Sequence, residues 1–499
     1  MTQTPEKPAR RRGLKRTIGI GGLFSIGYAD VGAGIYLALG LVSIHAGYAT
    51  PLAIGAAAIA YVLTGLTYAE LSSTYPRAGG SATFAQAAFG DNIGFLAGWM
   101  LCLDYVVTAA IFAIPAIAYL SYFDAALNEP FWLGIGAILL LGALVFLNVI
   151  GIRESVNFTL GLALLDIVSE VALIILGLVL VLIPGGLLFS WPSSFQLFTN
   201  PTLPEFVQGI TLAMVSYLGI EALAQAAEET KVAGRTVPRA VMATLGSVVV
   251  LYLLISIVAV NVVPPMTLST TFKNDPLSGV ARSLPGAGSL IAIWIALLGC
   301  SISIIGANAG IIGSSRTLYA LSKYKMLPGK FGAIHSKFRT PWIAILVFGL
   351  GSIILVAFAS FGSFTGSEDP LVLLGSLYNV GALVAYVSAH ASLLVTRNTD
   401  RPRFRPYRVP LTLRFKRAAG VLELPILPLL GLLATSAIWV AVILTHELGR
   451  ELGIVWVAMG MGMYIYFRRK NRLPLRGRAP PEPRETSGSE KGEGSILSA

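Results

Sequence analysis

Long apolar stretches alternate with short polar ones along the chain until about residue 467. Residues 171–183 and 248–263, for example, contain no charged side chain and lie within stretches close to the roughly 20 residues that a helix needs to cross a bilayer. A helix in a soluble core would be shorter and polar on one face. The pattern therefore predicts an all-α polytopic membrane protein with 12 transmembrane helices. The predicted spans are residues 17–44, 47–74, 92–123, 130–150, 155–184, 203–228, 237–263, 285–322, 340–360, 370–396, 422–445 and 451–467.

The composition and the placement of charge agree with this prediction. Of the 499 residues 55% are hydrophobic and 12% charged, whereas about a quarter are charged in soluble proteins. The net charge of +11 could suggest a nucleic-acid partner, but the basic residues gather in alternate loops, and the opposite loops contain chiefly Lys273, Arg282 and Arg450. By the positive-inside rule both termini lie in the cytoplasm. We therefore expect a multi-pass protein of the inner cell membrane, with the lipid bilayer and no nucleic acid as its partner.

The sequence offers no sign of an enzyme or of a cofactor. Cys102 and Cys300 lie in apolar spans, where they act as small packing residues and not as a disulfide. Clustered metal ligands, a phosphate-binding loop and a Ser–His pair are not found. The basic N-terminus has no cleavage site behind a short apolar core, so it leads into an uncleaved first helix. The Pro-, Glu-, Gly- and Ser-rich end of the chain is predicted to be disordered.

Two predicted spans are poor continuous helices. In the first, Gly27, Gly32 and Gly34 surround a single acid, Asp30, and each glycine costs about 1 kcal/mol of helix propensity relative to alanine. Glycines can also serve close packing between helices. An acid at mid-membrane depth, however, costs at least about 2.5 kcal/mol and should face a cavity or a partner. We expect a break in this helix.

The sixth span repeats the pattern, with small residues and one acid in Ser216-Tyr-Leu-Gly-Ile-Glu221. The two spans are five apart. This spacing is typical of two inverted five-helix repeats with broken helices around a site at the midplane of the membrane. At such breaks, free N–H groups attract carboxylates and free carbonyl groups attract cations.

Seven short strings follow one another in a recognisable order. They are Gly32-Ala-Gly-Ile-Tyr36; Pro76-Arg-Ala-Gly-Gly80 with 84–90; Gly219-Ile-Glu221; Ala227-Glu-Glu-Thr-Lys231; Thr236-Val-Pro-Arg239; Asn308 with Ser315-Arg-Thr-Leu-Tyr-Ala320 and Leu327-Pro328; and Leu377-Tyr-Asn379 with Gly381. From the first to the eleventh span the chain thus resembles the amino acid-polyamine-organocation superfamily of permeases. The resemblance implies a leucine-transporter-like fold, in which two inverted five-helix repeats are followed by two further helices, and substrate uptake or exchange coupled to an ion.

On this view the chain divides into six regions. They are a basic cytoplasmic tail at 1–16, the first repeat at 17–184, the second repeat at 203–396, a basic cytoplasmic loop at 397–421, the last two helices at 422–467 and a disordered cytoplasmic tail at 468–499.

The chain departs from the family pattern at three places. Asp30 stands where amino acid carriers usually have an apolar residue, and Asp166 stands where some proton-coupled members have a lysine. Tyr324-Lys325 replaces the usual Asp-Gly. The first two departures make the predicted cavity acidic, which favours a positively charged substrate or coupling ion.

The candidate substrate-binding residues lie at the two breaks and on the third span. The backbone of Gly32–Gly34 could contact a carboxylate or carbonyl group of the substrate, and Tyr217 could close over it or simply pack. Glu221 could bind an amine, carry a proton or hydrogen-bond the unwound backbone. The set is Asp30, Gly32, Ala33, Gly34, Tyr36, Asp104, Ser216, Tyr217, Gly219 and Glu221.

Two further sets concern ions and gating. Asp166 and Glu170, one helical turn apart, are candidates for proton or ion coupling, as are Ser301 and Ser303, although hydroxyl groups in membrane helices often bond the backbone behind them. Acids can equally be satisfied by nearby hydroxyl groups. An ion-pair gate at the inner mouth could be formed by Glu228, Glu229 and Arg239.

The sequence therefore predicts a secondary active transporter that takes up an amino acid or a related amine with protons by alternating access. An inorganic-cation carrier for an ion such as potassium is the alternative that Asp30 suggests. A sensor or scaffold that no longer transports is a further alternative, which would call for a large ordered cytoplasmic domain.

Overall fold

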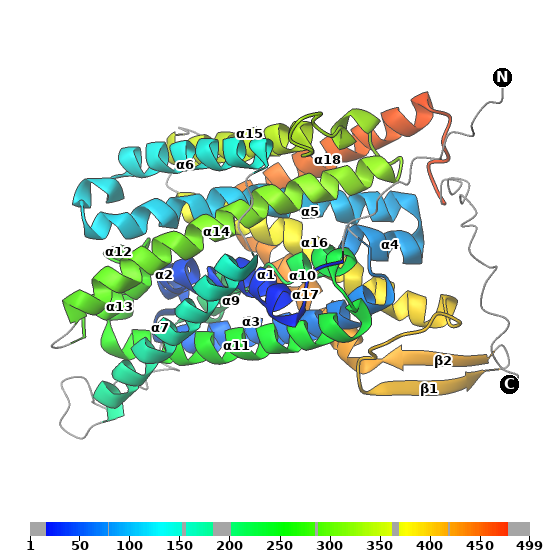
Figure 1. Ribbon diagram of the computed structural model, residues 1–499. Coiled ribbons are helices and arrows are strands. Elements are labelled where there is room, and N and C mark those ends of the chain that lie inside the picture. Colours follow the sequence, from blue (N-terminus) through cyan, green and yellow to red (C-terminus); the bar gives the residue numbers. More distant parts are fainter. Residues whose placement is uncertain are drawn as a thin grey trace, which may run out of the picture.

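The computed structural model describes residues 16–77, 79–151, 156–182, 201–284, 288–361, 369–417 and 420–477. Long helices run side by side in one bundle (Figure 1). Within the described residues, nine helical stretches are long and apolar enough to cross a bilayer, and one of them, Ile20–Thr74, contains three helices. The protein is therefore a polytopic, almost entirely helical membrane protein.

The bundle is built from α1 (Ile20–Gly32), α2 (Ile35–Ala46), α3 (Thr50–Thr74), α5 (Asp91–Ala118), α6 (Pro130–Ile150), α7 (Val156–Leu182), α9 (Leu203–Val215), α10 (Glu221–Ala226), α11 (Ala233–Val262), α14 (Gly288–Lys323), α15 (Trp342–Phe361), α16 (Pro370–Thr399), α17 (Ile426–Thr445) and α18 (Glu447–Lys470). Shorter helices are α4 (Ser81–Phe89), α12 (Pro265–Thr270) and α13 (Pro276–Arg282). Single 3-10 turns cover Gly47–Ala49, Tyr119–Tyr122, Ala125–Asn128, Ala227–Glu229 and Gly329–Gly332.

The two ends of the bundle carry different short elements. At one end lie α4 and a hairpin of β1 (Thr412–Arg417) and β2 (Gly420–Pro425), and at the other lie α12 and α13 (Figure 1). α5 and α14 pack along each other through the bundle, and α16 and α6 also pack on α5. The apolar side chains between these helices form the core.

Both predicted helix breaks lie where the sequence places them. α1 ends at Gly32 and α2 begins at Ile35, so only two residues separate the halves. α9 ends at Val215 and α10 begins at Glu221, which leaves 216–220 without helix. Elsewhere the predicted ends differ by a few residues: α11 begins at Ala233 instead of 237, and α18 covers Glu447–Lys470 instead of 451–467.

The region expected to be a basic loop, 397–421, is instead structured. α16 continues to Thr399, and β1 then pairs with β2 in antiparallel register, with Thr412 opposite Pro425. The physical reason is the buried Glu70 at the end of α3. Its carboxylate accepts hydrogen bonds from Arg397 Nε (2.9 Å), from Arg405 (3.2 Å) and from the N–H of Val409 (2.7 Å), which ties this region to the bundle.

The tail expected to be disordered from residue 468 is folded over its first ten residues. Arg468 is buried in α18 and pairs with Asp91 (3.0 Å), and the carbonyl of Gly477 accepts a hydrogen bond from the N–H of Asp91 (3.0 Å). The buried ion pair holds the segment against α5. The remainder of the predicted tail, 478–499, and most of the basic tail at 1–16 lie outside the described residues.

Candidate functional site

A tyrosine hydroxyl spans the break between α1 and α2. Tyr252 of α11 donates to the carbonyl oxygen of Val31 and accepts from the N–H of Ile35 (3.2 Å). These two backbone groups have the sequence separation of a helical hydrogen bond, so the phenol replaces one turn of helix. The break can therefore be buried without leaving these groups unsatisfied.

The break between α9 and α10 has a similar support. Gly219 has φ 122°, a conformation that side chains disfavour, and its N–H donates to the hydroxyl of Tyr386 (3.3 Å). This hydroxyl in turn donates to the carboxylate of Glu221 (2.8 Å). The unwound segment is thus fixed from α16.

The two breaks face each other. A Cβ on Gly34 would lie 2.6 Å from the Cα of Ser216, and one on Gly219 would lie 3.0 Å from Cγ of Asp30. Glycine at both positions lets the unwound segments touch. The structure therefore brings together candidates from the first and the sixth predicted spans, Gly34 and Asp30 from one and Ser216 and Gly219 from the other.

Three buried acids surround this point of contact. Asp30, Asp104 and Glu221 are at most 1% exposed, and their carboxyl groups lie close enough to interact electrostatically. Within the described residues, both oxygens of Asp30 have no hydrogen-bond partner, and the carboxyl groups of Asp104 and Glu221 lie within hydrogen-bonding reach of each other. No ion pair of the described part involves any of the three. We call these residues the acidic centre.

Tyrosine rings form a wall beside the acidic centre. The ring of Tyr217 packs between those of Tyr61 and Tyr252, with centroid distances of 5.0 and 5.3 Å. Tyr217 is fully buried and packed between these rings. Among the described residues, the hydroxyl groups of Tyr61, Tyr105 and Tyr217 have no partner. The centre therefore offers hydroxyl groups as well as carboxyl groups to a ligand.

A second pair of acids lies on α7, next to the first break. Asp166 accepts hydrogen bonds from Tyr28 of α1 (3.0 Å) and from Tyr36 of α2. Glu170 follows one turn later and is fully buried. Its carboxyl group lies within reach of the hydroxyl of Tyr28, which donates to Asp166. Here the predicted coupling residues meet Tyr36, which the sequence assigned to the substrate site.

The two serines of α14 differ from each other. Ser301 donates to the carbonyl oxygen of Leu297 (2.8 Å) in its own helix, as hydroxyl groups in membrane helices often do. Ser303 is buried, and its hydroxyl finds no partner within the described ranges. Within these ranges no three His, Cys, Asp or Glu side chains are placed to hold a metal ion.

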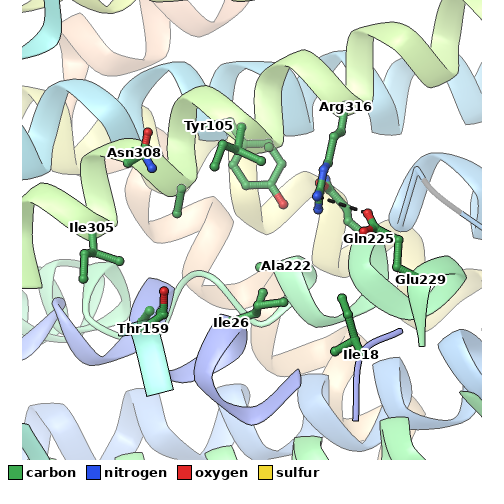
Figure 2. A pocket seen from close by; sticks show the side chains of 14 residues that line it. Ile18, Ile26, Tyr105, Thr159, Ala222, Gln225, Glu229, Ile305, Asn308 and Arg316 are labelled. Carbon is green, nitrogen blue, oxygen red and sulfur yellow. Dashed lines mark ion pairs between the residues drawn. The ribbon is translucent and has the colours of Figure 1, made fainter. Parts of the chain in front are cut away.

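A cavity of about 200 Å³ lies between α1, α5, α10 and α14 (Figure 2). Its wall includes Ala29, Tyr105 and Ala222, the chain neighbours of the three acids. It extends toward Ile18 and Glu229, near the start of α1. The cavity therefore connects the surroundings of the acidic centre with the end of the bundle that carries the hairpin.

An ion pair lies at the outer edge of this cavity. Glu229 is 3.1 Å from Arg316 of α14, and the dashed line in Figure 2 marks the pair. The carbonyl oxygen of Glu229 also accepts hydrogen bonds from the N–H groups of Thr17 (2.9 Å) and Ile18 (3.1 Å). The gate predicted from the sequence consisted of Glu228, Glu229 and Arg239. In the structure Arg239 is exposed on α11, and Glu229 pairs with Arg316. The sequence does contain a signal for the role of Arg316, because this residue is a charged side chain within an otherwise apolar predicted span.

Comparison with known proteins identifies the family of this chain. The family described as amino acid permease matches residues 18–465. The branched-chain amino acid permease of Bacillus subtilis is 26% identical over 92% of this chain and 94% of its own length. The low-affinity putrescine importer of Escherichia coli is 26% identical over 85% and 87%, and the methylthioribose transporter of Bacillus subtilis 26% over 94% and 97%. The chain therefore belongs to the amino acid permease family, whose members are membrane transporters and not enzymes.

Proposed function

We propose that this permease takes up an amino acid or a related amine together with protons, by alternating access around its two helix breaks. The acidic centre carries the proposal. Three buried carboxyl groups lie together, Asp30 has no hydrogen-bond partner, and none of the three is paired with a cation in the described structure, so an ammonium group would complete the site. Relatives named for branched-chain amino acids and for putrescine move compounds that contain such a group.

The residues at the breaks would hold the rest of the substrate. The ammonium group binds among Asp30, Asp104 and Glu221. The backbone of Gly32, Ala33 and Gly34 meets a carboxylate, because these residues lie at the start of α2, where the helix dipole favours negative charge. Further contacts to the substrate come from Tyr36, Ser216, Tyr217 and Gly219.

Uptake together with protons requires that the proton and the substrate are bound at the same time, so the coupling proton needs a group apart from the ammonium site. Asp166 and Glu170 on α7 are buried carboxyl groups of this kind and are the proposed place for the coupling proton. Ser303, with its unpartnered hydroxyl, is the better of the two serine candidates for a cation next to α1.

Alternating access would use the cavity as its release path. The ion pair of Glu229 with Arg316 and the backbone contacts of Thr17 and Ile18 close that path at the end of the bundle with the hairpin. The protein lies in the inner membrane, with 12 crossings and an inverted five-plus-five repeat. In this arrangement the end with the hairpin faces the cytoplasm. Substrate would enter from the end that carries α12 and α13.

Uptake by purified protein in liposomes tests the substrate class. Labelled leucine, lysine and putrescine are offered under an inward pH gradient, and at least one should accumulate saturably and stop accumulating when a protonophore is added. Asp30→Asn should lower kcat/KM about 100-fold, since a lost interaction between opposite charges in a buried site is worth about 3 kcal/mol. Asp124→Asn, at an exposed position, is the matched control and should transport normally.

The result that would overturn the proposal is no accumulation of any amino acid or amine. If labelled rubidium, as a substitute for potassium, entered instead and Asp30→Asn stopped it, the protein would be an inorganic-cation carrier. If neither class of substrate entered, a sensor without transport would be the remaining function.

A further inference from the structure

One carboxylate holds both halves of the first broken helix. Tyr28 belongs to α1 and Tyr36 to α2, and both hydroxyl groups donate to the two oxygens of Asp166 on α7. All three side chains are at most 1% exposed. Only two residues link α1 to α2. Because both halves are hydrogen-bonded to the same side chain of a third helix, these bonds help to set the angle between them.

The ring of Tyr28 lies across the gap between the halves. A Cβ on Gly32 would come within 2.8 Å of Cε1 of Tyr28, so the missing side chain of this glycine leaves the space that the ring occupies. Tyr252 bridges the backbone on another side of the break. Phenol groups therefore surround the break and hold it in the geometry seen here.

The two tyrosines differ in how firmly they are held. The carbonyl oxygen of Tyr36 accepts a further hydrogen bond from the hydroxyl of Tyr119 (2.8 Å), which anchors α2. The other half, α1, carries Ile26 on the wall of the cavity and is preceded by Ile18 at the closed edge. A movement that opens this cavity would displace α1, and with it Tyr28, while α2 stays in place.

A second acceptor for Tyr28 lies one turn along α7. Glu170 is buried and lies near enough to interact with Tyr28 and Tyr36, and the hydroxyl of Tyr28, which donates to Asp166, is also within reach of its carboxyl group. Four residues of helix correspond to a step of about 6 Å along the axis. A buried carboxyl group is costly unless each state of the protein supplies it with a partner.

We propose that Asp166 and Glu170 are two alternative acceptors for the hydroxyl of Tyr28, so that α7 holds α1 in two positions. Asp166 holds the closed position seen here, and Glu170 holds the position in which α1 has moved and the cavity is open. Both acids are positioning residues for the hinge. The inference rests on the alternating access proposed above, and it assigns the hinge to a specific exchange of one hydrogen bond.

Labelling of one cysteine on α1 tests the exchange. Ile26→Cys is introduced after Cys102→Ala and Cys300→Ala, and the rate of its reaction with a maleimide reports how open the cavity is. Asp166→Leu should raise this rate about tenfold and Glu170→Leu should lower it about tenfold, because leucine has no acceptor and each change removes the acceptor of one position. Ser169→Ala, on the same turn of α7, is the matched control and should leave the rate unchanged.

If the two acids position α1, the two substitutions change the labelling rate in opposite directions. A general loss of structure would instead raise the labelling rate in both variants. In a Tyr28→Phe background the Asp166→Leu and Glu170→Leu changes should lose their effects on the rate, since the hydroxyl that is exchanged is gone. Tyr28→Phe also keeps the test decisive if Asp166→Leu does not fold. Equal or same-sign shifts for the two acids, or unchanged shifts without the hydroxyl, would overturn the proposal.

The assay contains no substrate, so its outcome is separate from that of the uptake experiment. Opposite shifts together with no amine uptake would leave the hinge standing and remove the substrate class. Amine uptake together with same-sign shifts would remove the hinge alone.

Discussion

A tyrosine hydroxyl stands at each helix break, Tyr252 at the first and Tyr386 at the second. Both lie in helices far along the chain from the breaks they support. A phenol serves well here because it can donate and accept at once, so that it satisfies two groups in a place that water does not reach. Asp30 could be recognised from the sequence as an unusual acid, whereas nothing near Tyr252 or Tyr386 in the sequence indicates their role.

At the same scale, Asp275 makes stability depend on pH. It lies outside the spans, between α12 and α13, where burial raises the pKa of its carboxyl from 3.8 to about 7, against the opposing effect of Arg282 at 3.7 Å. The folded protein thus binds this proton more tightly than the unfolded chain does. As the pH rises from about 4 to about 7, Asp275 therefore lowers the free energy of unfolding, by up to about 4 kcal/mol above pH 7.

We predict that Asp275→Asn raises the thermal midpoint of the purified protein at pH 8 and changes it much less at pH 5, where the carboxyl of the folded protein is protonated. Scanning the two proteins at both pH values measures the difference. Asp124→Asn, at an exposed position, should show no such dependence. An equal effect of Asp275→Asn at pH 5 and pH 8 would contradict the assignment.

At the scale of elements, contact between the two unwound segments requires glycine. A Cβ on Gly34 would meet the backbone of Ser216 at 2.6 Å, and a backbone atom cannot turn aside as a side chain can. We predict that Gly34→Ala separates the breaks, costs about 1 to 3 kcal/mol of stability and abolishes most uptake. Thermal midpoints and liposome uptake measure the two effects.

Gly142 in α6 provides the comparison for this prediction, because nothing lies within 4 Å of a Cβ at that position. Gly142→Ala should keep uptake and gain slightly in stability, since alanine favours helix by about 1 kcal/mol. Normal uptake by Gly34→Ala would show that the two breaks do not touch during transport.

The hairpin shows that a high content of charged residues can obscure a folded element in the sequence. Residues 412–417 and 420–425 alternate partly between apolar and polar positions, as strands do. The many arginines of this region instead indicated a solvated loop. Loops near membranes are basic for reasons of topology, so charge alone does not distinguish a loop from a folded element.

At the scale of the whole molecule, buried ion pairs join distant parts at the end with the hairpin. Glu70 of α3 binds Arg397 of α16 and Arg405 beyond it, and Asp91 of α5 binds Arg468 of α18. Their side chains are at most 2% exposed. These pairs connect the first helices of the chain with the last ones.

Removal of one partner from such a pair should be strongly destabilising. We predict that Glu70→Gln costs about 3 to 5 kcal/mol, because it leaves two buried guanidinium groups without a counter-charge. Glu423→Gln is the control: its partners Arg408 and Arg414 are 45% and 63% exposed, and it should cost less than about 1 kcal/mol. Thermal or denaturant unfolding in detergent compares the two, and equal effects would contradict the prediction.

The sequence by itself determined the membrane class, the family, the positions of both helix breaks and the presence of buried acids around them. These properties are local: apolar length predicts a span, glycine weakens a helix, and an acid in an apolar span is costly wherever the chain places it. Only the tertiary structure decided which groups meet. Arg316 instead of Arg239 pairs with Glu229, Tyr28 and Tyr36 share Asp166, and Arg397 reaches Glu70. Such pairs join residues tens to hundreds of positions apart, so they depend on how the helices pack and not on any pattern within one helix.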